Sequence, residues 1–319
     1  MSFLLGTTLL AVVTALACAL PGAFIVLRRN SMLVEGIAHA VLPGIVVGYA
    51  LTRDLNSPWL IFGAALAGLL VVLCNEWLIR TGLFTGDAPQ GLVFPALFAS
   101  GVILVTLDFN HVHLHTEVVL VGDLNLAAFQ QLVVNGVSIG PEYLYVMLTV
   151  LAVNAAFIAI FYQRLKVTTF DPEFAAVLGM RTGLLNTSFM FLVSVTVVTA
   201  FHAAGVILVI SLLVVPAATA LLISRRLSIM LVFTALFAVT GALAGFWIAY
   251  FLNAATSAAM ALFYGVLFVA VAVAEKLSTR GSRMRRSLEA SHANATGDTG
   301  SQAGRREGAA LSANRQAAE

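Results

Sequence analysis

The sequence predicts an all-α protein, a polytopic bundle of about eight or nine transmembrane helices. Two observations support this prediction. Of the 319 residues, 60% are hydrophobic and only 10% are charged, a composition typical of a membrane protein rather than of a soluble domain. A membrane-spanning helix needs about 20 apolar residues, and stretches of this kind recur along the chain as far as Lys276. We therefore expect a transmembrane domain over residues 1–276.

The apolar stretches and the polar residues between them define nine candidate spans. Their predicted bounds are 3–27, 32–52, 58–80, 88–107, 142–163, 184–203, 205–224, 228–252 and 257–275. The first stretch is long and ends in Arg28 and Arg29, so we expect it to remain as a span rather than to be cleaved as a leader. Residues 116–134 could form a further helix that lies at the outer surface or dips partly into the membrane.

Basic residues orient these spans. If the spans alternate in direction, Arg28, Arg80, Arg164 and Arg225 share one side with the Arg-rich tail, and the positive-inside bias makes this side cytoplasmic. The N-terminus is then outside and the C-terminus cytoplasmic. Residues 277–319 contain few large apolar side chains, so a disordered cytoplasmic tail is expected there. Its basic start could contact anionic membrane lipid, although a simple topology signal is the favoured interpretation.

Glu35 and His39 form the most suggestive pair of ionisable residues within a predicted span. Their spacing places them on one helix face, about one turn apart. Ionisable groups inside a membrane usually face a bundle interior or a water-filled path, and carboxylate with imidazole suits zinc, manganese or iron. A hydrogen-bonded structural pair is equally compatible with the spacing. Pro43 and Gly44, one turn further along, could break the helix and expose carbonyl groups to a cavity.

A histidine-rich segment lies on the predicted outer side. It contains His111, His113, His115 and Glu117. In an extended segment, alternate side chains point to the same face, so these residues are a candidate entry site for a metal. A solvated loop without a bound ion is equally compatible with such a short tract.

The loop after the fifth predicted span has the signals of a short capped helix. Its defining residues are Asp171, Pro172, Glu173, Phe174, Leu178 and Gly179. Asp171 can cap the helix, Pro172 suits its first position, an acidic residue next to it complements the helix dipole, and Gly179 can end it. Phe174 and Leu178 would then share a face suited to docking in a groove of a partner protein. An ordinary capped loop helix is the alternative.

Five segments together resemble a known family, the metal-ion permeases of ATP-binding-cassette importers that serve manganese, zinc and iron. The matching segments are residues 32–44, 86–104, 113–124, 170–179 and 205–220, in the family's order and spacing. The first segment has Val34, Glu35 and Gly36 where the family usually has Gly-Asp-Ala. Pro216 lies in the last segment and is a second expected helix break.

The resemblance implies a transport subunit of the bacterial cytoplasmic (inner) membrane, without catalytic residues. It would import a divalent transition metal by alternating access, manganese in the first place and zinc or iron otherwise, with the metal as substrate and no permanently bound cofactor. It implies that Glu35 and His39 occupy the family's intramembrane acid and histidine positions. The implied partners are a cytoplasmic ATP-binding subunit dimer docked on the Asp171–Gly179 helix, a second permease of the same or a related sequence, and an extracytoplasmic metal-binding protein. No nucleic-acid partner is expected.

Two other functions compete with metal import by an ATP-driven transporter. The chain contains no Gly-x-x-x-x-Gly-Lys-Ser/Thr loop, so ATP hydrolysis would have to come from a separate subunit. A secondary transporter in which Glu35 carries a coupling proton would instead show uptake that persists when the ATPase is inactive. A membrane-embedded hydrolase is disfavoured because the chain lacks a His-Glu-x-x-His motif.

Overall fold

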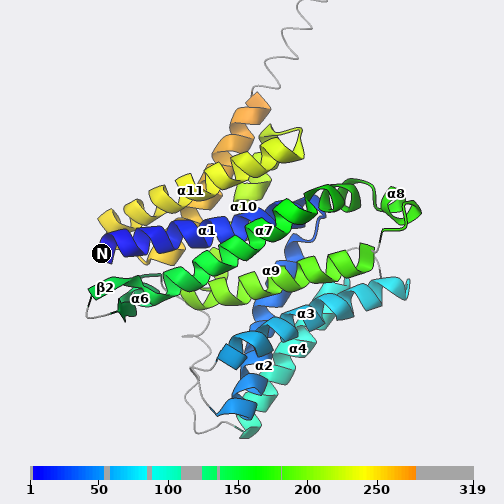
Figure 1. Cartoon of the computed structure of the whole chain (residues 1–319), viewed down its shortest axis with the longest axis horizontal. Coiled ribbons are helices and arrows are strands. Elements are labelled where there is room, and N and C mark those ends of the chain that lie inside the picture. The colour runs from blue at the N-terminus through cyan, green and yellow to red at the C-terminus, as the bar shows by residue number, and fades with distance from the viewer. Residues whose placement is uncertain are drawn as a thin grey trace, which may run out of the picture. The chain divides into compact units, whose positions relative to one another are not determined.

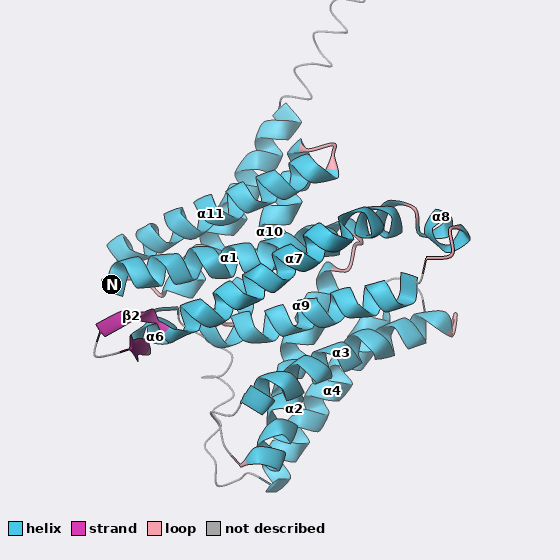
Figure 2. Ribbon diagram, in the orientation of Figure 1, coloured by secondary structure: helices cyan, strands magenta, loops and turns pink. Residues whose placement is uncertain are grey.

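A computed structural model describes residues 3–53, 58–84, 88–108, 124–134, 137–180 and 182–277. Over these ranges, nine helices are long and apolar enough to cross a membrane. Figure 2 shows that short strands are the main departure from helix in the described part of the chain. The predicted all-α polytopic bundle is therefore confirmed.

The elements follow the chain in a simple order (Figure 1). They are α1 (Phe3–Leu27), α2 (Ser31–Thr52), α3 (Pro58–Arg80), α4 (Ala88–Asp108), α6 (Leu124–Phe129), β1 (Gln131–Val134), β2 (Val137–Pro141), α7 (Glu142–Phe170), α8 (Pro172–Val177), α9 (Thr182–Ala204), α10 (Val206–Ile223) and α11 (Leu227–Leu252). A final helix runs over Thr256–Leu277. The predicted spans agree with these bounds to within two residues, with one exception. Most of the predicted tail lies outside the described residues.

The exception is α7, which continues to Phe170 rather than ending at residue 163. Charged residues near position 164 do not stop a helix, whereas a proline disfavours helical geometry in the residue before it. Asp171 precedes Pro172 and has φ −145° and ψ 79°. The proline therefore sets the end of α7, seven residues beyond the prediction.

A β-hairpin replaces part of the surface helix predicted over residues 116–134. Within the described residues, only α6 is helical there, and β1 then pairs with β2 in an antiparallel register with Gln131 opposite Pro141. The pairing is irregular between Leu132 and Val133. These strands are rich in valine and isoleucine, which favour extended backbone, so the helix prediction was wrong for residues 131–134.

Two helix groups make up the bundle, and α9 contacts both. In one group α1 packs against α7, α10 and α11; in the other α2 packs against α3 and α4. Small residues bring the backbones together, because a Cβ atom at Gly22 would clash with the Leu213 carbonyl of α10, and one at Gly44 with Ala64 of α3. The buried Asn154 side chain of α7 joins helices as well, donating to Ala17 O of α1 and Thr196 Oγ1 of α9, each at 2.9 Å.

The two expected helix breaks lie within continuous helices. α2 runs through Pro43 and α10 runs through Pro216. At Gly44, the missing side chain allows close packing of α2 on α3. Gly205, by contrast, has φ 77° and separates α9 from α10, in the left-handed region that favours glycine.

Candidate functional site

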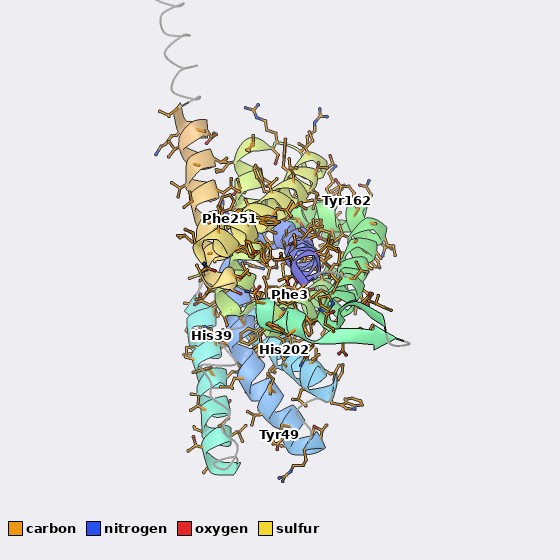
Figure 3. All side chains as sticks on the ribbon, turned by 90° about the vertical axis from the view of Figure 1, so that its left-hand side faces the viewer. Phe3, His39, Tyr49, Tyr162, His202 and Phe251 are labelled. Atoms are coloured by element: carbon orange, nitrogen blue, oxygen red, sulfur yellow. The ribbon has the colours of Figure 1, made fainter. Side chains whose placement is uncertain are left out.

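Glu35 and His39 lie on α2 in different surroundings. The Glu35 side chain is exposed, whereas the His39 ring is half-buried. Figure 3 places His39 where α2 lies beside α4, and its ring centroid is 5.1 Å from that of Phe94 and 5.8 Å from that of Phe98. His39 Nδ1 is buried and has no hydrogen-bond partner among the described residues. His39 therefore has a nitrogen that is unpaired within the described part of the chain, in a ring that packs against two phenylalanines of α4.

Two buried amide oxygens in the same helix group share this condition. Asn75 Oδ1 on α3 and Gln90 Oε1 on α4 have no hydrogen-bond partner among the described residues, and the two side chains are only 4% and 8% exposed. A buried polar atom without a partner costs about 1–3 kcal/mol. Such groups in a native structure call for an explanation, often an unseen water or ion.

The helix crossing near Gly36 places these amides close to the first turns of α2. A Cβ atom at Gly36 would lie 3.3 Å from Val71 Cγ1 and 3.6 Å from Phe94 Cβ, so the three helices share one level there. Asn75 is one turn from Val71, and Gln90 is one turn from Phe94. Both steps lead toward the N-terminal end of α2. The sequence analysis missed both residues, although amides inside apolar spans were a visible signal.

The described residues of one chain do not form a closed metal site. No group of three or more His, Cys, Asp or Glu side chains among them could hold a metal ion. Imidazole nitrogen and amide oxygen can nevertheless contact a divalent ion. The helices α2, α3 and α4 instead offer single potential metal ligands. His39 lies on α2, and Asn75 and Gln90 lie nearer the start of that helix.

An apolar groove lies beyond His39 in the other half of the same helices. Its volume is about 760 Å³ and it begins at Pro43, one turn from His39. Trp59, Phe62 and Leu104 are among its lining residues, and Thr52 and Ser100 are the polar ones. Without a charged side chain in its lining, the groove does not resemble a metal site.

The predicted loop helix is confirmed as α8. Asp171 Oδ1 accepts a hydrogen bond of 2.9 Å from the backbone N–H of Phe174, which satisfies one of the free donors at the helix start. Pro172 occupies the first turn, and Gly179 has φ 68° just after the helix. The capping signals in the sequence thus correspond to real contacts.

Large apolar side chains around α8 face outward. Phe170, Phe174, Val177 and Leu178 are 60%, 52%, 84% and 57% exposed. Figure 1 shows α8 at the end of the bundle where α7 and α9 are joined. A cluster of this kind is typical of an interaction surface; below we call these four residues the α8 surface.

The remaining predicted residues do not add to this site. His111, His113, His115 and Glu117 lie outside the described residues. His202 on α9 is exposed, and its ring centroid lies 5.3 Å from that of Tyr143 on α7. His202 is thus an exposed residue near the C-terminal end of α9, in contact with α7.

Comparison with known proteins decides the family. The model of the ABC 3 transport family matches residues 1–275. This chain belongs to the ABC 3 transport family. Within the family, it is 43% identical over 263 residues to the zinc transport system membrane protein TroD of Treponema pallidum, covering 82% of this chain and 71% of TroD. It is 37% identical to the manganese transport system membrane protein MntD of Bacillus subtilis, covering 81% and 87%.

A solved structure supports the same assignment. PsaBC from Streptococcus pneumoniae, determined in complex with Fab, matches with a TM-score of 0.69 and 26% identity, covering 85% of this chain and 91% of that chain. A second structure, titled as an inward-facing conformation of a putative metal-chelate type ABC transporter, has a TM-score of 0.62 at 19% identity and shares the fold. As a member of the ABC 3 transport family, this chain is a multi-pass membrane protein and a transport permease subunit.

Proposed function

We propose that this chain is the permease subunit of an ATP-driven importer that carries a divalent transition metal across the bacterial cytoplasmic membrane. Family membership is the observation that supports this proposal most directly. ATP hydrolysis takes place in a separate cytoplasmic subunit pair that docks on the α8 surface, and a second permease and an external metal-binding protein complete the importer. Alternating exposure of the pathway moves the ion.

The metal pathway passes His39 and Glu35 on α2. His39 offers a buried nitrogen without a hydrogen-bond partner among the described residues, and the exposed Glu35 can face a second permease across the membrane-embedded surface. Asn75 and Gln90 supply oxygen atoms nearer the start of α2. Single ligands of this kind bind a metal ion weakly. A permeation pathway needs such weak binding, because the ion must be released again.

The cargo is manganese or zinc, with iron as a further candidate. The names of the relatives divide between the first two metals, since TroD is named for zinc and MntD for manganese. Nitrogen and carboxylate ligands accommodate all three ions.

Metal uptake by cells that express the complete importer tests this function. Wild type is compared with His39→Ala and Glu35→Gln at matched membrane abundance, with manganese, zinc and iron supplied one at a time. We expect ATP-dependent uptake of one preferred metal, reduced about tenfold or more by either substitution. His202→Ala is the matched control, because it removes another histidine from a membrane helix without touching the pathway.

Three outcomes would count against the proposal. Uptake that persists with an inactive ATPase would favour a proton-coupled secondary transporter. Unchanged uptake in both α2 variants would make Glu35 and His39 a structural pair. An absence of uptake of all three metals by the wild-type importer would remove the metal cargo altogether.

The proposed outer entry site consists of His111, His113, His115 and Glu117. It would raise the local concentration of the ion before transport, so its effect should be largest at low metal. Replacing the three histidines together is expected to raise the metal concentration needed for half-maximal uptake. Normal uptake at every concentration would exclude this role.

A further inference from the structure

Arg28 is the centre of a polar network that joins four helices. It directly follows α1 and uses all three nitrogens of its guanidinium. Nε donates to Thr169 Oγ1 at 3.1 Å, Nη1 to Asn186 Oδ1 at 2.6 Å and Nη2 to Thr168 Oγ1 at 3.3 Å. Its Cζ atom lies 5.1 Å from the ring centroid of Phe189, within the range of a cation–π contact.

The guanidinium remains charged at neutral pH although it is partly buried. Removal from solvent lowers the pKa of Arg28 to about 10, and the Glu76 carboxylate acts in the opposite direction. A planar guanidinium fixes several acceptors in a defined geometry, which a lysine ammonium does not. Neighbouring Arg29 is exposed. The two adjacent arginines thus differ in their surroundings, although the sequence analysis treated them as a common topology signal.

Asn186 extends the network from α9 to α3. Its Oδ1 accepts from Arg28, while its Nδ2 donates to Glu76 Oε1. Arginine only donates and a carboxylate only accepts, so the residue between them must do both. An asparagine meets this requirement and an aspartate does not. Glu76 Oε2 also lies 3.8 Å from Arg80 Nη2.

The network brackets α8 on both sides. Thr168 and Thr169 belong to the last turn of α7, directly before Asp171, and Asn186 lies in the second turn of α9. α8 contacts both α7 and α9. A docked partner that displaces α8 would therefore move the end of α7 and the start of α9. Arg28 connects these helix ends to α1, and Asn186 connects them to α3. From α3 the movement reaches α2, which packs against α3 and carries His39.

We propose that Arg28 and Asn186 are positioning residues that transmit movement of α8 to α3, and so couple ATP hydrolysis in the partner to opening of the metal pathway. Neither residue touches the metal. This inference rests on the proposed function, because it concerns transmission between a partner ATPase and this permease. Energetic coupling between distant sites requires a continuous set of contacts or a shared two-state element, and the network supplies the contacts.

The test measures metal uptake and ATP hydrolysis together in proteoliposomes that contain the complete importer. Arg28→Gln keeps one amide donor but cannot reach all three acceptors. Asn186→Asp keeps the acceptor for Arg28 and places a second carboxylate against Glu76, so it cuts the link to α3 alone. For both variants we expect assembly and an ATPase rate within about twofold of wild type, with the metal moved per ATP reduced about tenfold.

Controls separate coupling from a merely structural role. Arg29→Gln removes the adjacent, exposed charge and is expected to leave the ratio of uptake to hydrolysis unchanged. Combining Arg28→Gln with Asn186→Asp should add little to either single variant, since both interrupt one route. Arg28→Lys should restore part of the ratio.

The results that overturn the inference differ from those that overturn the proposed function. If the wild-type importer takes up no metal with ATP, the proposed function fails. If wild type is active and both variants keep its ratio, or lose uptake and hydrolysis in proportion, the coupling role is wrong. If neither variant assembles, the network is a requirement for folding and the inference is equally overturned.

Discussion

Two regions of this bundle differ in how their polar side chains are hydrogen-bonded. At the end that carries α8, the Arg28 guanidinium donates three hydrogen bonds and Asn186 both accepts and donates. Within the α2–α3–α4 group, His39, Asn75 and Gln90 each bury an atom without a partner among the described residues. A fully bonded polar network makes a structure rigid, whereas unpaired buried atoms destabilise it. The comparison separates a region suited to holding helices together from one suited to meeting a ligand.

The largest expected effect comes from breaking the bonded region. Leucine offers no hydrogen-bond donor, so Arg28→Leu leaves the Asn186 oxygen without its charged partner and the half-buried Glu76 carboxylate without a half-buried cation nearby. Leaving a half-buried acceptor without its charged donor costs about 1–3 kcal/mol. We expect a clearly lower midpoint of thermal unfolding for the detergent-purified permease. A midpoint equal to that of wild type would show that the network contributes little to stability.

The unbonded region should respond in the opposite direction. Gln90→Leu replaces an amide whose buried Oε1 has no partner among the described residues by an apolar group of similar size, so it should stabilise the folded chain by about 1 kcal/mol. Metal uptake should nevertheless fall, because an oxygen donor is lost from the pathway. Thermal unfolding and uptake, measured on one preparation, check both halves of the prediction. A destabilised variant would mean that Gln90 is already bonded in the membrane.

A smaller effect is expected at α8, where a single side chain caps a short helix. Asp171→Ala removes the acceptor for the Phe174 N–H, and loss of such a cap costs about 1 kcal/mol. Hydrogen exchange of the Phe174 amide should speed up, while the long helices stay protected. Asp171→Asn retains an acceptor and serves as the control. Equal exchange in all three proteins would refute the capping role.

The smallest effect should follow from Arg80→Gln. The Arg80 nitrogen lies 3.8 Å from Glu76 and its side chain is 76% exposed, so water and salt screen the pair. Exposed pairs of this kind contribute less than about 1 kcal/mol. Uptake and the unfolding midpoint should both match wild type. A marked loss of either would show that Arg80 belongs to the Arg28 network.

Local features of this chain could be predicted from its sequence, whereas contacts between distant residues could not. Apolar length and punctuation determine a membrane helix locally, so the spans, the tight connection at Gly205 and the capped α8 were all predictable. Partners across the bundle were not, because Arg28 meets Thr169 and Asn186 at separations of 141 and 158 residues. For the same reason, the positions of Phe94 and Phe98 beside His39 could not be anticipated. The hairpin was missed because short apolar stretches do not distinguish strand from helix.

The exposure of the α8 surface should affect the amount of this protein in a cell. In a newly made copy without its partner, the α8 surface is exposed to water. Its side chains are those of Phe170, Phe174, Val177 and Leu178. Exposed patches of this kind attract chaperones and proteases, and they favour aggregation. The steady-state amount of this permease should therefore follow the supply of the subunit that covers α8, so that surplus copies are degraded and the stoichiometry of the assembly is corrected after synthesis.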